Sequence, residues 1–321
     1  MVKEEQESAN RPDNTAFTQQ RLPAWQPILS AGIIIPGFVI IGLTFIGIGV
    51  ALFVTSKSIQ DMEIDYTGVE TDSDCYKCTN TDEKNCVCRL DFNIPTLIEG
   101  PVFFYYGLSN YFQNYRRYGV SKDDTQLSGD LDNFKTPSDD CSPYETDDTF
   151  VLYQNLNGSN QEVPFDGKGI AWWTDYNVKY RNPDVTPLKD AFEGTVKPPF
   201  WSKPAYELDP TDPNNNGFIN QDFLVWMRRA ALPDFRKLYR RISQDDYARG
   251  LPAGNYTLQI GYNYPVMSFK GKKKVVFSNV SWMGGRNEFL GIAYLVIGSW
   301  CIVMSIVMLI VYAKFKFPEE D

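Results

Sequence analysis

The chain has no histidine among its 321 residues. Without histidine there is no ordinary general base near neutral pH, no serine–histidine or cysteine–histidine nucleophile pair, and few routes to a catalytic zinc site. The nucleophile elbow G-x-S-x-G, the P-loop and the dinucleotide pattern G-x-G-x-x-G are also missing. The sequence therefore predicts a protein that is not an enzyme, with no cofactor and no small-molecule substrate of its own.

Charge is absent from two stretches, residues 22–56 and 289–313. A helix needs about 20 apolar residues to cross the hydrocarbon core of a bilayer, and both stretches are long enough. A buried helix of a soluble core is the alternative, but such helices rarely run this long without a charge. The sequence predicts a tail, a transmembrane helix that acts as an uncleaved signal anchor, a large domain, a second transmembrane helix and a tail: residues 1–27, 28–55, 56–288, 289–313 and 314–321.

Both tails are predicted to be cytosolic. Arg11 and Arg21 precede the first span and only Lys57 follows it closely, which favours a cytosolic N-terminus under the positive-inside rule. Basic residues before the second span favour the opposite orientation, but long domains translocate largely regardless of their charge. Neither span contains an ionisable side chain, so neither provides a proton relay, an ion ring or a voltage sensor.

Four cysteines lie close together in the pattern C-x2-C-x7-C-x-C: Cys75, Cys78, Cys86 and Cys88. Four thiolates could hold a structural zinc ion, but the second pair is spaced by one residue rather than two. Two disulfides in an oxidising compartment are the favoured interpretation, and we expect no metal. Four cysteines allow three connectivities, and the spacing does not choose among them. Cys141 has no evident partner, and Cys301 lies inside the second span.

Three N-glycosylation sequons begin at Asn157, Asn255 and Asn279, all in the middle domain. Asn279 lies only ten residues before the second span, where the membrane restricts its modification. The sequons and the cysteines together predict a lumenal or extracellular domain. This domain has more acidic than basic residues, which argues against a nucleic-acid partner.

The middle domain shows strand patterns. Apolar residues alternate with polar ones over 256–264, which predicts a strand with one buried face. The turn at 270–272 is expected to lead into a partner strand at 275–282. Residues 101–106 form a further predicted strand, followed by a short helix that carries Leu108, Tyr111, Phe112 and Tyr115 on one face.

Residues 220–242 favour two helices. Asn220 is the expected N-cap of the first, and Pro233 is expected to begin the second. The second has an apolar stripe and a basic face, for which solvation together with pairing to the acidic loops is the favoured interpretation: Arg236, Lys237, Arg240 and Arg241. The predicted fold is therefore two transmembrane α-helices flanking a large β-rich ectodomain, an antiparallel β-sandwich with short helical insertions.

One run resembles a calcium loop, with Asp212, Asn214, Asn216 and Gly217 at positions 1, 3, 5 and 6. Position 12 requires a bidentate Glu and is Phe223. An Asx-rich turn that caps the following helix is the favoured interpretation. In the first span, Gly32, Gly37, Gly42, Gly47 and Gly49 permit close approach of another helix, which indicates packing against a second protein.

Several sequence motifs in this chain resemble motifs of a known family. They are residues 11–27 of the leader and the segments 64–68, 104–110, 169–175, 216–220, 251–254 and 281–285. In this order, and spread over residues 11–299, they resemble the transmembrane protein 30 family, also called the cell division control protein 50 family. That family supplies the accessory β-subunits of type IV P-type ATPases, the phospholipid flippases.

The resemblance implies a non-catalytic, chaperone-like subunit in a one-to-one complex with such an ATPase, in contact with membrane lipids. The subunit would support the stability of the pump, its exit from the endoplasmic reticulum and aminophospholipid translocation. Expected locations are the endoplasmic reticulum, Golgi and secretory vesicles, and the plasma membrane. The resemblance also implies the bridges Cys75–Cys88 and Cys78–Cys86. Partner contacts are expected in the cytosolic leader, at Arg11, Arg21, Pro23 and Trp25.

The chain departs from the family after Cys141, where the second cysteine of a third bridge is missing and a loop is shortened. In this it resembles a divergent paralogue such as the third member of the family. Two alternative functions remain: a two-pass, pore-forming channel subunit that trimerises, and a membrane-anchored lectin. Polar pore-lining residues are missing from both spans, which counts against the channel.

Overall fold

The computed structural model describes residues 14–23, 30–79, 86–130, 149–156, 159–197, 201 and 203–315. The chain divides into two compact units. One comprises the chain up to Ala51 together with Phe289 onward, and the other runs from Leu52 to Glu288. The second unit is the ectodomain.

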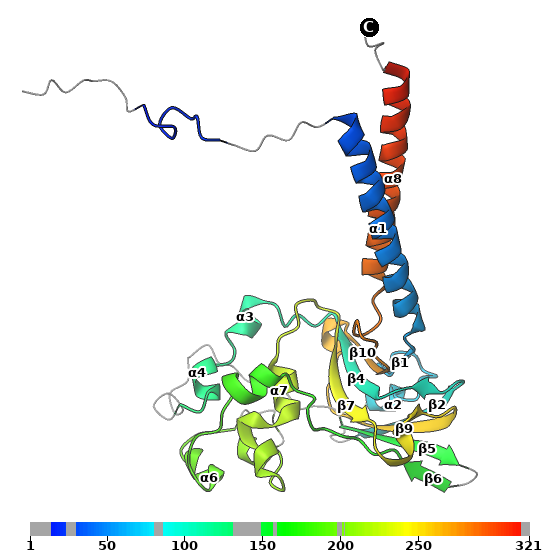
Figure 1. The fold of residues 1–321 in the computed structure, drawn as a ribbon. Helices are drawn as coiled ribbons and strands as arrows, with labels where there is room; N and C mark the ends of the chain where they lie inside the picture. Colours follow the sequence, from blue (N-terminus) through cyan, green and yellow to red (C-terminus); the bar gives the residue numbers. More distant parts are fainter. Residues whose placement is uncertain are drawn as a thin grey trace, which may run out of the picture. The chain divides into compact units, whose positions relative to one another are not determined.

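Two antiparallel sheets form the body of the ectodomain (Figure 1). The first has the order β1-β10-β4-β7 and the second β2-β9-β5-β6. Their bounds are Asp61–Asp65 (β1), Lys272–Ser278 (β10), Val102–Ser109 (β4), Phe235–Ile242 (β7), Cys86–Ile94 (β2), Gly254–Tyr262 (β9), Thr149–Leu156 (β5) and Ser159–Glu162 (β6). A short pair, β3 (Ile98–Glu99) with β8 (Gly250–Leu251), lies outside them. The predicted β-sandwich is confirmed.

The core lies between the sheets. In β9 every second residue is buried, so the predicted alternation is confirmed, and the inward residues are Tyr256, Leu258, Ile260 and Tyr262. Phe277 of the opposite sheet stacks on Phe92 with ring centroids 5.6 Å apart. Facing aromatic and aliphatic side chains therefore close the space between the sheets, and their burial drives the packing.

A second, smaller core lies in the helical insertions between β4 and β7. Short helices surround it: α3 (Arg116–Gly119), α4 (Asp124–Leu127), a π-helix at Asp175–Lys179, α6 (Leu188–Ala191), and α7 (Gln221–Met227). Single 3-10 turns occur at Ala205–Glu207, Pro213–Asn215, Gly217–Ile219, Asp245–Tyr247 and Met267–Phe269. Asn220 accepts a hydrogen bond from Phe223 N at 3.1 Å, so the predicted N-cap of α7 is confirmed.

The predicted second helix after Pro233 is wrong, because residues 235–242 form strand β7. The pairing of β7 with β4 contains a bulge: Phe104 pairs with Arg240 and Tyr105 pairs with Leu238, which leaves Tyr239 as the extra residue. A bulge shifts the inward–outward alternation by one position. Apolar residues on either side of it therefore acquire a spacing that imitates a helix.

The basic residues of β7 form ion pairs with acidic residues or donate hydrogen bonds to carbonyl oxygens. Arg236, Arg240 and Arg241 form ion pairs with Asp61, Asp222 and Asp166. Lys237 is buried and donates to the carbonyl oxygens of Trp226 at 2.5 Å and Arg228 at 2.8 Å. The pairing expected from the sequence is thus present, although on a strand.

Two further local predictions are wrong. The strands β9 and β10 are consecutive but belong to different sheets, so the chain crosses the sandwich at residues 263–271 instead of forming a hairpin. The short helix expected at 108–115 is absent, since β4 continues to Ser109. Asn110 then adopts a left-handed conformation (φ 57°), and its side chain donates to Phe269 O at 2.6 Å.

The other unit consists of two long apolar helices that pack together. α1 runs over Ala31–Ser58, its last turns belonging to the ectodomain unit, and α8 over Glu288–Phe315. At about 1.5 Å per residue each is long enough to cross a bilayer. A Cβ on Gly42 would lie 3.0 Å from Gly298 O, and the Phe45 and Tyr294 rings lie 5.1 Å apart. Small residues thus bring these two helices into contact.

Candidate functional site

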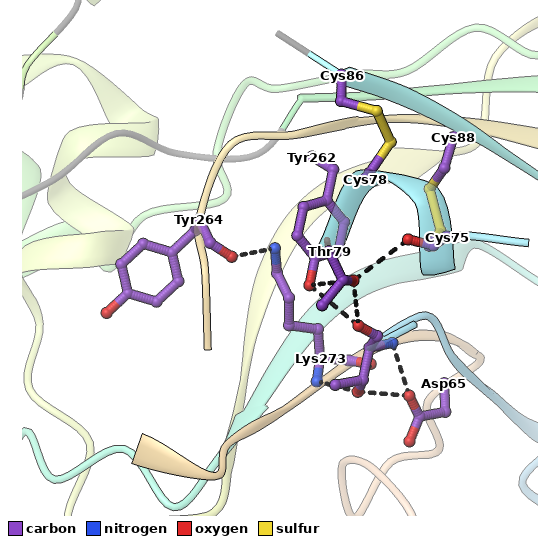
Figure 2. Close-up of a disulfide and its surroundings, with 10 residues drawn as sticks. Asp65, Cys75, Cys78, Thr79, Cys86, Cys88, Tyr262, Tyr264 and Lys273 are labelled. Atoms are coloured by element: carbon purple, nitrogen blue, oxygen red, sulfur yellow. Dashed lines mark hydrogen bonds between the residues drawn. A yellow bond between two sulfur atoms is a disulfide. The ribbon is translucent and has the colours of Figure 1, made fainter. Parts of the chain in front are cut away.

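The disulfide cluster consists of Cys75, Cys78, Cys86 and Cys88 (Figure 2). Cys75 is bridged to Cys88 and Cys78 to Cys86, with Cα–Cα distances of 5.2 and 5.5 Å. This is the pairing that the family resemblance implies. The bridges attach the short helix α2 (Tyr76–Thr79) to strand β2, and Cys75 and Cys88 are buried in the main core.

A hydrogen-bonded network connects this cluster to the first sheet (Figure 2). Tyr262 of β9 donates to Thr67 O at 3.0 Å, and Thr79 of α2 donates to the same carbonyl at 3.0 Å. Thr67 in turn donates to Asp65 at 2.6 Å and accepts from Lys273 N at 2.8 Å. Residues of both sheets and of α2 therefore meet at Thr67.

Lys273 places a charged group in this interior. Its side chain is 1% exposed, and its Nζ donates to Tyr264 O at 2.6 Å. The same nitrogen lies 3.6 Å from the centroid of the Tyr262 ring and 5.4 Å from that of Tyr66. A cation over the faces of aromatic rings is stabilised by their quadrupoles, most strongly where water is excluded.

Gly68 explains why the chain turns tightly beside the cluster. Its φ is +75°, a conformation that favours glycine, and a Cβ would lie 2.7 Å from Cys75 O. Only a residue without a side chain fits against α2 here. The cluster therefore has a bracing role, because the disulfides, a buried cation and a close glycine join α2 to both sheets. The bridged sulfurs are not available as nucleophiles or metal ligands.

The structure describes two of the three sequons. Asn255 is exposed at the start of β9, and its Oδ1 accepts from Asn93 at 2.7 Å. Asn279 is partly buried: its Nδ2 donates to Glu99 O at 3.0 Å and its Oδ1 accepts from Gln60 N at 2.9 Å. Asn157 lies outside the described residues. The Asn255 amide is thus open to a glycan, whereas the Asn279 amide nitrogen is engaged.

The calcium-like run forms an Asx-rich turn, which confirms the interpretation favoured from the sequence. Asp212 caps the turn through Asn214 N at 3.0 Å, and Asn216 donates to Tyr206 O at 2.7 Å. Hydrogen bonds from Thr211 and Asn215 lower the pKa of Asp209 nearby. Over the described ranges, no group of three or more Cys, Asp or Glu side chains is arranged to hold a metal ion.

Ionisable groups in the helical insertions serve packing. Burial lowers the pKa of Lys122, which pairs with Asp124. Burial, followed by the charges of Asp124 and Asp175, raises the pKa of Tyr180. Two lysine side chains lie over the Tyr180 ring. Burial among the side chains of the second core is the largest cause of both shifts.

Comparison with known proteins identifies the family to which this chain belongs. The model of the LEM3 (ligand-effect modulator 3) family / CDC50 family matches residues 52–318, which include the whole ectodomain and all of α8. The chain belongs to the CDC50 family. Together with the two apolar helices, membership makes it a membrane protein.

Relatives within the CDC50 family match nearly the whole chain. It is 50% identical to human cell cycle control protein 50B, with 98% of this chain and 97% of that protein covered. Identity to bovine cell cycle control protein 50C is 44%, covering 95% and 94%. Identity to ALA-interacting subunit 3 of Arabidopsis thaliana is 33%, covering 95% and 87%. These identities do not single out the third paralogue that the missing cysteine suggested.

The other expected CDC50 features are only partly described. Arg21 and Pro23 are exposed, and Arg21 donates to Asn14. Arg11, Trp25 and Cys141 lie outside the described residues, so the leader contact stays a prediction.

Exposed tryptophans are the feature that sequence reasoning missed. Trp172, Trp173 and Trp282 are largely exposed, and Trp172 stacks with Arg228 at 4.0 Å. All three lie in motifs that carry the family resemblance, at 169–175 and 281–285. Their position in these motifs could have indicated them from the sequence, because motifs shared within a family usually form either a buried core or a contact surface.

Proposed function

We propose that the chain is the non-catalytic accessory subunit of a type IV P-type ATPase that translocates phospholipids. Family membership carries the proposal, supported by the Arabidopsis relative, whose name describes an ALA-interacting subunit. ATP hydrolysis and lipid transport then belong to the partner. This chain supplies a braced ectodomain and two helices to a one-to-one complex.

The membrane helices suit a binding role. Gly42 and Gly49 contact α8, whereas a Cβ added at Gly32, Gly37 or Gly47 of α1 would have no heavy atom within 4 Å. These three glycines leave room for the helix of another protein to approach closely. Between their ends, over residues 31–56 and 289–313, these helices also contain no Asp, Glu, Lys, Arg or His, so they do not resemble an ion pathway.

The proposed topology puts both tails in the cytosol and the ectodomain in the lumen or outside the cell. The two disulfides are consistent with this, because such bonds persist in oxidising compartments. We therefore propose a glycoprotein that passes with its pump from the endoplasmic reticulum through the Golgi and secretory vesicles to the plasma membrane. The leader, with Arg11, Arg21, Pro23 and Trp25, supplies the cytosolic contact.

The direct functional test is rescue of transport in cells that lack endogenous family members. A fluorescent type IV P-type ATPase should leave the endoplasmic reticulum, and labelled aminophospholipid should enter the cytosolic leaflet, only when this chain is expressed. An ATPase that exits and transports equally well without the chain would contradict the proposal. Cation conductance from the chain alone would favour the pore-forming alternative.

A further inference from the structure

The juxtamembrane loop, residues 280–286, joins β10 to α8 and is attached at both ends to the end of α1. Before the loop, Asn279 exchanges hydrogen bonds with Gln60: Gln60 N donates to Oδ1 at 2.9 Å and Asn279 N donates to Gln60 O at 3.2 Å. After it, Asn287 N donates to Ser56 Oγ at 3.0 Å, and Ser56 is fully buried. The loop is thereby fixed beside the last turn of α1.

These attachment points lie at the ends of the two charge-free stretches, where a spanning helix leaves the hydrocarbon core. The first charge-free stretch ends at Ser56 and the second begins at Phe289. The charged residues that adjoin them, Lys57 and Glu288, form an ion pair at 3.2 Å. Three extended residues span roughly 10 Å, so Trp282 cannot lie far from Asn279 and the end of α1. The polar interface of a bilayer is about 5–8 Å thick on each side.

The tip of the loop is a hydrogen-bonded turn that presents one large side chain. Ser281 and Gly284 exchange two backbone hydrogen bonds of 2.9 Å, which makes a two-residue turn with Trp282 at its first central position. Gly284, the last residue of this turn, has φ +103°, a conformation that favours glycine, and Ser281 Oγ also accepts from Met283 N. A Cβ on Gly285 would lie 2.9 Å from Arg236 Nη2, so the loop is held against β7 as well.

Trp282 is nevertheless 80% exposed. Packing of the ectodomain does not explain why a hydrogen-bonded turn beside two membrane-spanning segments exposes an indole ring to water. Tryptophan prefers the headgroup level of a bilayer, where its ring is shielded and its N–H remains hydrogen-bonded. We propose that Trp282 anchors the ectodomain to the bilayer surface on its own side of the membrane, with lipid headgroups and upper acyl chains as its partner.

This inference goes beyond the proposed function, because it requires membrane insertion but no ATPase. The test uses the full chain in phosphatidylcholine vesicles whose acyl chains carry bromine, a contact quencher of indole, at either a shallow or a deep position. The tryptophans are compared one at a time as W282F, W300F and W173F. Trp300 lies within α8 and is the positive control; Trp173, 70% exposed in the ectodomain, is the matched negative control.

We expect W282F to remove emission that the shallow bromolipid quenches and W300F to remove emission that the deep bromolipid quenches. W173F should remove emission that only aqueous acrylamide quenches. Unchanged circular dichroism checks the folding of each variant. The proposal is overturned if W282F instead removes acrylamide-accessible emission and leaves bromolipid quenching at the wild-type level. Shielding of Trp282 only when an ATPase is present would also overturn it, by assigning the residue to a protein contact.

Discussion

Lys273 Nζ lies 3.6 Å from the centre of the Tyr262 ring, and these residues belong to opposite sheets of the sandwich. The contact joins β10 to β9 at the place where α2 is bridged to β2. A charged lysine is costly to bury unless its interactions compensate, so its position indicates a structural role for the whole cluster.

Removing the Lys273 side chain should therefore destabilise the ectodomain. K273A leaves a cavity between Tyr66 and Tyr262 and removes the hydrogen bond from Lys273 to Tyr264 O, and we expect a loss of about 2–5 kcal/mol in unfolding free energy. K273M retains most of the packing volume and should lose less. Urea unfolding of the purified full chain in detergent measures both. Equal stability of K273A and wild type would contradict the role assigned to this residue.

The Cys75–Cys88 bridge should be needed for folding in the cell. The double variant C75A/C88A loses a buried cross-link, which commonly costs about 2–5 kcal/mol, so we expect retention in the endoplasmic reticulum. Sensitivity of the glycans to endoglycosidase H reports this. C301A is the matched control, because Cys301 is a free cysteine in α8. Normal surface delivery of the double variant would argue against a structural bridge.

The two described sequons should behave differently. N255Q should remove one glycan, seen as a shift on a denaturing gel, because the Asn255 side chain is exposed. N279Q should cause no shift but should cost roughly 1–3 kcal/mol, because it disturbs the bonds to Gln60 and Glu99. S281A destroys the sequon while keeping the Asn279 amide, and it separates the two effects. A gel shift with S281A would show that Asn279 carries a glycan.

The leader should contribute to the complex without contributing to the ectodomain fold. R21A combined with W25A is expected to lower the yield of co-purified ATPase while glycosylation stays normal. The arginine is exposed in the structure, so its loss removes no packing. N14A removes the partner of Arg21 and leaves its charge in place, which makes it the control. An unchanged yield for R21A/W25A would remove the leader from the proposed interface.

Local sequence patterns correctly predicted the elements whose structure depends on residues close together in the sequence. The two charge-free stretches became α1 and α8, the alternation from Tyr256 onward became β9, and Asn220 caps α7. Each of these depends on periodicity or on a side chain within three residues, which a sequence displays directly.

The wrong predictions concern elements whose structure depends on segments that are distant in the sequence. Whether β10 pairs with β9 or β4 depends on which sheet each strand joins, and the turn at Lys270 does not specify it. The spacing in β7 looked helical because a bulge opposite Phe104 and Tyr105 displaced its alternation. The inward position of Lys273 was hidden in a run of lysines that suggests a solvated turn, since only the aromatic rings of other strands make it favourable.

The central claim is most directly tested by isolating the tagged full chain from cells in mild detergent and identifying what co-purifies by mass spectrometry. The account predicts a type IV P-type ATPase in near-equal amount, in a particle whose native mass fits one copy of each chain. Recovery of the chain alone, or as an oligomer of itself, would contradict an accessory role.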